Sequence, residues 1–184
     1  KKNNINIKSD LQALLLNDLI DVEEASNIIS SIDNSSVRFF VNNKKINKSL
    51  RRASPPFITS TLQQEASNRF GMSPSYCMSV AQKLYEAGMI TYMRTDSLIL
   101  SNKALNDCEK LITNTYGPEY YKRTQYNKKK TKGAQEAHEA CRPVNVSRIS
   151  VKGVDKCGPR EEKLYRLIWQ RTVASQMTPA NIET

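Results

Sequence analysis

The stretch Gly88-Met89-Ile90-Thr91-Tyr92-Met93-Arg94-Thr95-Asp96-Ser97 is the part of the chain around which the rest is organised. Gly88 suits the left-handed conformation that ends helices, so a helix over Ser79–Ala87 is expected to stop there. The β-branched and aromatic residues that follow favour an extended segment. Residues two apart in such a segment project to the same face. Tyr92 and Arg94 should therefore point the same way, about 7 Å apart along the chain.

A phenol beside a guanidinium is a chemically suitable pair for attack on a phosphate. Free tyrosine has a pKa near ~10, so a nearby cation is needed to stabilise its anion or to neutralise the phosphate that it approaches. A Tyr-x-Arg pattern in a strand is more often packing plus a surface charge. The pair alone therefore leaves both interpretations open.

Ordered blocks of sequence add a family resemblance. Met89–Ser97 resembles the active-site tyrosine motif of type IA DNA topoisomerases, the bacterial topoisomerase I branch in particular. Further blocks resemble that family in the same order, the last of them more loosely: Pro56–Ala66, Ala81–Gly88, Ala134–Ala140 with Arg142-Pro143, and Lys163–Pro179. The first ~50 residues match only in general pattern.

The resemblance implies an α+β fold that is mainly α. We expect a winged-helix-like (CAP-like) catalytic domain with a small antiparallel sheet, plus part of an arch domain. Residues 1–54 would be an arch-domain fragment and linker, residues 55–180 the catalytic tyrosine domain, and residues 181–184 the start of the return into the arch. A solvated linker accounts equally well for the basic residues of 44–52.

The resemblance also implies an activity. A type IA topoisomerase cleaves one DNA strand without ATP through a 5′-phosphotyrosine, passes another strand and religates, which relaxes negative supercoils. In this chain Tyr92 would be the nucleophile, and Arg94 would stabilise the charge on the phosphate and phenolate. The residues expected to contact the DNA are Gln82, Lys83, His138 and Arg142.

His138 is the only histidine of the chain. We expect it in a short helix that ends near Arg142, because Pro143 disfavours helix in the residue before it. Gln135, His138 and Arg142 would then share one face at three- and four-residue spacing. A lone histidine is more often structural, so a packing role stays open beside the phosphate contact.

The family's acidic, magnesium-binding Toprim domain is not matched in this sequence. Asp107, Glu109 and the other acids lack its spacing. We therefore expect Mg2+ to belong to that absent domain, with no metal site in this chain. We further expect a fragment that neither cleaves nor relaxes DNA by itself, and whose partners are single-stranded DNA and the remaining domains of the same enzyme.

The composition agrees with a polyanionic partner. Lys plus Arg number 28 against 18 for Asp plus Glu, a formal charge of +10 over 184 residues, which favours nucleic acid, although a solvated basic surface is the simpler alternative. No run is long enough to span a bilayer and no signal peptide is recognisable. We expect a cytoplasmic, DNA-associated protein (at a nucleoid or viral replication site) that is not secreted and has no membrane partner.

The four cysteines are far apart and resemble neither a zinc site nor a disulfide framework, so we expect reduced, mostly buried thiols. Local patterns predict the other elements: helices over 22–32, 60–70, 101–117 and 159–177, a helix starting at Ser73-Pro74, a strand over 37–41, and a basic stretch over 122–132 with tyrosines around it. Trp169 is expected to pack the domain together.

Two other classes of function account for part of the sequence. A non-enzymatic winged-helix DNA-binding regulator explains the charge and the helix pattern but does not need Tyr92. An interaction module of the replication machinery explains the basic stretches but predicts no dependence on single strands.

Overall fold

The structure is a computed structural model that describes residues 21–32, 45–126 and 139–184. The chain divides into two compact units, Lys1–Lys45 and Ile46–Thr184. The domain boundaries expected from the sequence stay a prediction. None of the helices in the described ranges is long and apolar enough to cross a membrane.

The first unit contains helix α1, Val22–Ile32. The carboxylate of Asp21 accepts a hydrogen bond of 2.9 Å from the backbone N–H of Glu24, so Asp21 caps the helix as its sequence position predicts. The strand expected over 37–41 lies outside the described residues.

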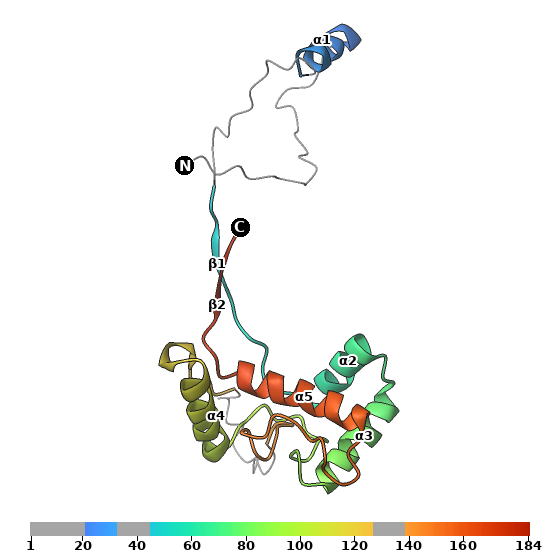
Figure 1. Cartoon of the computed structure of the whole chain (residues 1–184), viewed down its shortest axis with the longest axis vertical. Coiled ribbons are helices and arrows are strands. Elements are labelled where there is room, and N and C mark those ends of the chain that lie inside the picture. Colours follow the sequence, from blue (N-terminus) through green and yellow to red (C-terminus); the bar gives the residue numbers. More distant parts are fainter. Residues whose placement is uncertain (1–20, 33–44, 127–138) are drawn as a thin grey trace, which may run out of the picture. The chain divides into compact units, whose positions relative to one another are not determined.

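The second unit is mainly helical, as the sequence predicts. Its elements are β1 (Lys48–Arg51), α2 (Thr59–Phe70), α3 (Pro74–Glu86), α4 (Asn102–Thr115), the 3-10 helix η1 (Pro118–Tyr120), α5 (Pro159–Ala174) and β2 (Ala180–Glu183) (Figure 1). Helix α2 packs against α3, and α3 packs against α5. The antiparallel pair β1–β2 is the sheet of the described residues.

Local residue chemistry accounts for the turn between α2 and α3. Gly71 has φ of +64° and donates to the Ser67 carbonyl, which ends α2 in the left-handed conformation predicted for it. The Ser73 hydroxyl then accepts a hydrogen bond from the Tyr76 N–H and caps α3, with Pro74 in the first turn.

The predicted start of α2 is wrong by one residue. The helix begins at Thr59, and the Ile58 N–H donates to the Thr61 hydroxyl at 3.1 Å. The spacing of Ser60 and Gln63 suggests a capping box at this helix start, but in the structure Ile58 is the N-cap residue and Thr61 occupies the third helical position.

Gly88 ends the turn that follows α3, as predicted. Its φ is +71°, its N–H donates to the Tyr85 carbonyl, and the Met89 N–H donates to the Leu84 carbonyl, both at 2.8 Å. This pair of bonds satisfies the last helical carbonyls. The chain then leads directly into the segment that contains Tyr92.

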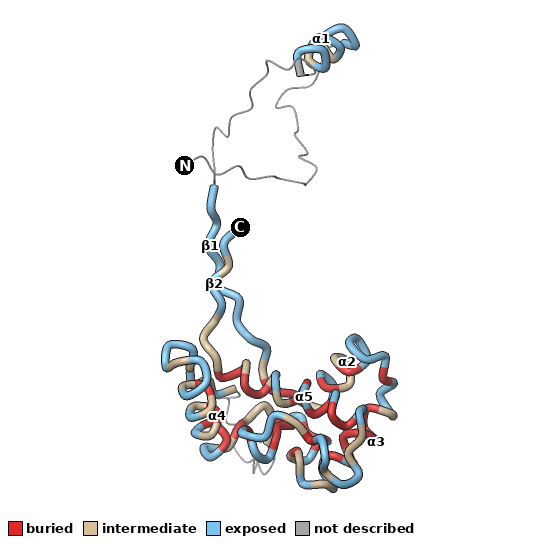
Figure 2. Tube along the Cα trace, in the orientation of Figure 1, coloured by how far each residue is buried: buried red, intermediate tan, exposed pale blue. Residues whose placement is uncertain are grey.

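The core of the second unit lies around α5, and Figure 2 shows buried residues running through α5 and the segments packed around it. Its largest fully buried side chains include Phe57, Leu62, Leu84, Ile90, Met93, Leu164, Tyr165 and Ile168. Trp169 packs against this core and donates to the Val146 carbonyl at 2.7 Å, which confirms its packing role. Helix α5 ends at Ala174, three residues before the Met177 expected, because the chain turns over Ser175–Met177.

The small antiparallel sheet that the resemblance implies is present as the β1–β2 pair, although the residues that form its two strands were not predicted. Lys48 lies opposite Glu183, and Arg51 lies opposite Ala180. Every residue of β1 is exposed, and Lys48 and Glu183 form an exposed ion pair at 3.2 Å. Part of the expected basic linker is therefore one strand of a solvated ribbon.

The cysteines are free, and Cys77, Cys108 and Cys141 are buried. Burial raises the pKa of Cys77 to about 11, and those of Cys108 and Cys141 to about 12. This confirms the prediction of unpaired, mostly buried thiols. Within the described ranges no group of three or more His, Cys, Asp or Glu residues could hold a metal ion.

Candidate active site

Burial alternates along the segment that follows Gly88. Met93 and Thr95 are buried, whereas Tyr92, Arg94 and Asp96 are exposed. Tyr92 and Arg94 are thus both exposed, and their pointing the same way stays a prediction. The extended backbone itself is short, since Ile90 forms only a single antiparallel bridge, with Pro143.

The backbone before Tyr92 is fixed by Thr91. Its N–H donates to the Arg142 carbonyl at 2.9 Å. Its hydroxyl donates to the Ala140 carbonyl at 2.7 Å and accepts from the Arg142 N–H at 3.0 Å. One threonine therefore ties the residue next to the phenol to a chain segment about fifty residues away.

The backbone after Tyr92 is fixed by Thr59, the first residue of α2. The Thr59 N–H donates to the Thr95 carbonyl at 2.9 Å, and the Thr95 N–H donates to the Thr59 hydroxyl at 2.8 Å. The same hydroxyl reaches the Met93 carbonyl at 2.9 Å. Both neighbours of Arg94 are thus anchored to the start of a helix.

The ring of Tyr92 contacts the ring of Tyr85, the penultimate residue of α3. The two ring centroids are 5.3 Å apart and the planes are inclined by 64°, an edge-to-face arrangement. Tyr92 keeps 43% of its surface exposed. Its side chain is therefore oriented by a neighbour while it stays open to a ligand.

Arg94 lines an open pocket of about 500 Å³ at the N-terminus of α2. The other lining residues are Ile58, Thr59, Ser60, Gln63, Thr95 and Asp96. The N-terminus of a helix carries a partial positive charge, which adds to that of the Arg94 guanidinium, while the Asp96 carboxylate in the lining opposes both.

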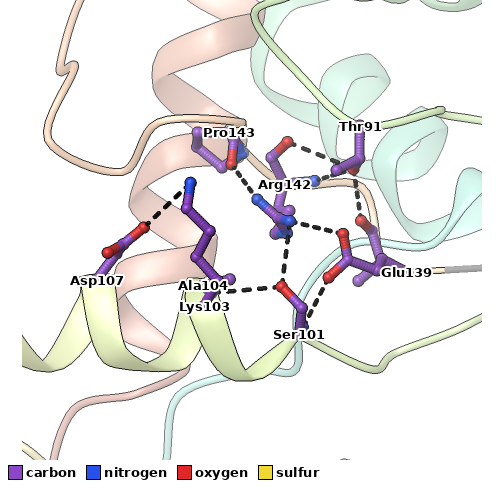
Figure 3. Close-up of polar contacts among 9 residues, drawn as sticks. Thr91, Ser101, Lys103, Ala104, Asp107, Glu139, Arg142 and Pro143 are labelled. Atoms are coloured by element: carbon purple, nitrogen blue, oxygen red, sulfur yellow. Dashed lines mark hydrogen bonds and ion pairs between the residues drawn. The ribbon is translucent and has the colours of Figure 1, made fainter.

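Arg142 is buried in an internal network with Glu139 (Figure 3). Its guanidinium pairs with the Glu139 carboxylate at 2.6 Å, donates to the Pro143 carbonyl at 2.8 Å and reaches the Ser101 hydroxyl at 3.3 Å. Glu139 also accepts from the Ser101 N–H at 2.7 Å, directly before α4. Burial by itself would raise the pKa of Glu139, but hydrogen bonds from Ser101 and the charge of Arg142 outweigh it and hold the pKa below its ordinary value.

The helix expected to run to Arg142 is wrong for the described residues 139–142. This segment is not helical, and Cys141 forms an antiparallel bridge with Phe57. The backbone groups of Arg142 bond to Thr91 instead of continuing a helical turn. His138 lies outside the described residues, so its expected DNA contact stays a prediction.

Gln82 and Lys83 point to different partners from α3. Gln82 donates to the Glu86 carboxylate at 2.8 Å and lies one turn before Tyr85 on α3. Lys83 is 3.5 Å from the Glu161 carboxylate at the start of α5. The two adjacent residues therefore do not lie on one surface.

A family model described as DNA topoisomerase matches residues 4–184. The chain belongs to the type IA DNA topoisomerase family. The "DNA topoisomerase 1 type prokaryotic" of Acanthamoeba polyphaga mimivirus is 49% identical over 146 residues, which are 79% of this chain and 17% of that protein. DNA topoisomerase 1 of Rickettsia felis is 42% identical over 168 residues, 86% of this chain and 21% of that protein.

The fold is similar to that of a solved topoisomerase I. Full-length topoisomerase I from Thermotoga maritima matches with a TM-score of 0.66 and 37% identity, over 89% of this chain and 26% of that one. The chain thus spans about a sixth to a quarter of the length of these type IA relatives.

The sequence interpretation gave no individual role to Thr59 or Glu139, and it placed Tyr85 on the buried face of its helix, whereas Tyr85 is 42% exposed. Thr59 and Tyr85 stand inside the blocks that resemble the family, but nothing local showed which of their neighbours they touch. Glu139 and Arg142 are three residues apart, a spacing that favours an ion pair on a helix. In the structure the two side chains form the ion pair although the segment is not helical.

Proposed function

We propose that Tyr92 is the nucleophile of a type IA topoisomerase reaction on single-stranded DNA. The observation that carries this proposal is the exposed phenol of Tyr92, held by Thr91 on one side and by Thr59 beyond Arg94 on the other. Fixing the backbone around a nucleophile lowers the entropy lost on reaching the reactive geometry.

In the proposed step the Tyr92 oxygen attacks a backbone phosphorus. The bond from phosphorus to the 3′ oxygen breaks, the phenol proton is lost, and the departing oxygen takes up a proton as a free 3′-OH. The product is a 5′-phosphotyrosine, so the phosphodiester bond energy is conserved. Reversal of the step reseals the strand after another strand has passed, and no nucleotide is consumed.

Arg94 would stabilise the negative charge on the attacked phosphate. Its planar guanidinium can donate two parallel hydrogen bonds to phosphate oxygens. The pocket that it lines also lies at the first turn of α2, where the partial positive charge of the helix favours an anion. Arg94 and the N-terminus of α2 would together supply positive charge to the phosphate that Tyr92 attacks.

Among the remaining residues, Gln82 would contact the strand from α3, where it lies one helical turn before Tyr85, the residue whose ring touches Tyr92. Lys83 would reach the DNA only where the strand also passes the start of α5. For Arg142 the internal bonds favour support of the Thr91 backbone over contact with a phosphate. His138 as a contact to a neighbouring phosphate rests on the family resemblance.

We also propose that strand passage and relaxation of negative supercoils need the parts of the longer relatives that this chain does not span. Those domains and single-stranded DNA would be its partners, at a DNA-associated location such as a nucleoid or viral replication site. Mg2+ would be held by the parts of the longer relatives that this chain does not span, and the steps described here concern this chain's own groups.

The test uses a chimera in which this chain replaces the matched segment of Thermotoga maritima topoisomerase I. We expect the chimera to form an SDS-stable adduct with a labelled single-stranded oligonucleotide. A Tyr92→Phe chimera should form none yet bind the oligonucleotide nearly as well, because binding is spread over many phosphate contacts. An adduct with the phenylalanine variant would show that another residue is the nucleophile.

The same experiment addresses the winged-helix regulator. Helices α2 and α3 would suit such a regulator, but that function predicts no covalent transfer of label and no effect of Tyr92→Phe. A chimera that binds DNA and never forms an adduct would favour the regulator.

A further inference from the structure

Two basic stretches that are about seventy residues apart in the sequence meet around Arg52. The first stretch is the end of β1 and the residues after it, and the second begins at Lys122. Arg52 and Ala53 line two pockets of the second unit, one beside α5 and one beside the 122–126 segment. The two pockets therefore adjoin one another.

The pocket beside α5, of about 360 Å³, is lined by four arginines and no carboxylate: Arg51, Arg52, Arg69 and Arg171. Glu65 pairs with Arg69 at 2.5 Å and with Arg171 at 3.5 Å. The Arg171 guanidinium also lies 4.3 Å from the centre of the Phe57 ring. Arg171 is thus held in place by a stack and an ion pair.

The second pocket, of about 180 Å³, adds Lys122 and Tyr126 to Arg52. Its backbone is fixed by the fully buried Gln176, which bonds to both the N–H and the carbonyl of Thr124. The Tyr126 hydroxyl donates to the Ser175 carbonyl at 3.1 Å. The basic and aromatic side chains therefore stand on a rigid frame at the end of α5.

The balance of charge in these pockets is strongly positive. Five cationic side chains line them, and Glu65 neutralises one. The C-terminus of α5 contributes roughly −0.5 of a charge at most, and its last carbonyls already accept bonds from Ser175 and Gln176. The helix end therefore does not cancel the excess.

We propose that these two pockets form a phosphate track for single-stranded DNA, separate from the pocket of Arg94. We define this basic track by its side chains: Arg51, Arg52, Arg69, Lys122, Tyr126 and Arg171. None of them lines the pocket at the N-terminus of α2. The inference rests on the proposed function in one respect, since it takes DNA as the polyanion.

The geometry favours a single strand over a duplex. Arginine forks bind phosphate bidentately in either form of DNA. The Tyr126 ring, however, is fixed by its hydroxyl and lines a small concave pocket, where only an unpaired base can stack. Basic side chains that follow the backbone beside such an aromatic ring are typical of single-strand binding.

The test measures binding of the 184-residue chain to a fluorescein-labelled (dT)20 as salt is varied. Each phosphate contact on a single strand contributes about 0.7 to the slope of log K against log salt. The double variant Arg51→Gln/Arg52→Gln should therefore lower the slope by about 1.4 and weaken binding roughly tenfold or more at low salt. Its matched control, Lys103→Gln/Lys110→Gln on exposed α4 positions, removes the same charge outside both pockets and should change neither value.

Variants of Tyr126 test whether the basic track prefers single-stranded DNA over duplex DNA. Tyr126→Leu should weaken binding to (dT)20 several-fold and leave binding to a duplex of 20 base pairs unchanged, whereas Tyr126→Phe should keep most of the single-strand affinity. Equal slopes for the arginine pair and the lysine pair would overturn the basic track. An equal loss on duplex and single strand would overturn its assignment to single strands.

The adduct assay distinguishes a failure of the basic track from a failure of the proposed role of Tyr92. At saturating oligonucleotide the Arg51→Gln/Arg52→Gln chimera should still form the covalent adduct. If no chimera forms one, the proposed function fails while the salt slopes still decide the basic track.

Discussion

The ring of Tyr85 meets the ring of Tyr92 edge to face, with centroids 5.3 Å apart. The two tyrosines are joined through the left-handed Gly88, which turns the chain back after α3. The contact is made by the rings, so the orientation of the Tyr92 side chain depends on the last turn of a helix. It leaves 43% of Tyr92 exposed.

Tyr85→Ala should slow adduct formation by the chimera about 2- to 10-fold, because an edge-to-face pair is worth ~0.5–1.5 kcal/mol beyond its buried area. Affinity for the oligonucleotide should change little. Tyr85→Phe keeps the ring and should restore the rate, which single-turnover gels would measure. A phenylalanine variant as slow as the alanine variant would mean that the Tyr85 hydroxyl matters instead.

Arg94→Ala should slow adduct formation at least about a hundredfold, since removal of one preorganised charge-stabilising group commonly has that effect. Arg94→Lys should recover little, because a point charge does not reproduce the two-pronged contact with phosphate. Arg148→Ala, an exposed arginine outside the Arg94 pocket, is the control. Wild-type rates in both Arg94 variants would make Arg94 a surface charge.

Thr59→Val keeps the shape of the side chain and removes the hydroxyl that bonds to Met93 and Thr95. The buried polar groups left behind should cost about 1–3 kcal/mol of unfolding free energy, measured by urea denaturation. Adduct formation should also slow, because Arg94 loses its anchor. Thr113→Val removes a hydroxyl that bonds only within α4 and should cost less. Equal losses for the two variants would contradict the anchoring role.

Glu139→Gln should lower the unfolding free energy at pH 7 by about 2 kcal/mol, below the ~3–5 kcal/mol of a fully buried pair. The pKa of Glu139 is depressed in the fold, so its contribution is present above the unfolded value of about 4.3 and is lost as pH falls through the folded value. The difference from wild type should therefore shrink below about pH 4 in urea titrations. Glu109→Gln, at an exposed pair, is the control. A gap that stays constant down to pH 3 would exclude the ionised carboxylate as its source.

The helix ends of the second unit could be predicted because their signals are local. Gly71 and Gly88 supply positive φ, and Ser73 and Ser101 cap the following turns with their own hydroxyls. The β1–β2 pair had no such signal, since its partners are more than a hundred residues apart and both strands are exposed.

In the candidate site, too, the features with a local sequence signal could be predicted and those that depend on distant contacts could not. The alternation of exposed Tyr92 and Arg94 with buried Met93 and Thr95 follows from the two-residue period of extended chain. Arg142 was placed on a helix because three- and four-residue spacing was extended too close to Pro143. In the structure Arg142 lies in an extended segment, and its burial depends on Glu139 and Ser101, contacts that no local pattern specifies.

The ribbon of β1 and β2 also determines how the second unit would respond to mechanical force. Asn47 and Thr184 exchange two backbone hydrogen bonds at the far end of the ribbon. A force that pulls these two residues apart would break the backbone hydrogen bonds between β1 and β2 one residue pair (one rung of the ribbon) at a time. Such rupture needs little force, because each rung yields before the next is strained. The helical core and the Tyr92 segment would keep their packing until the last rung, Arg51 with Ala180, had opened.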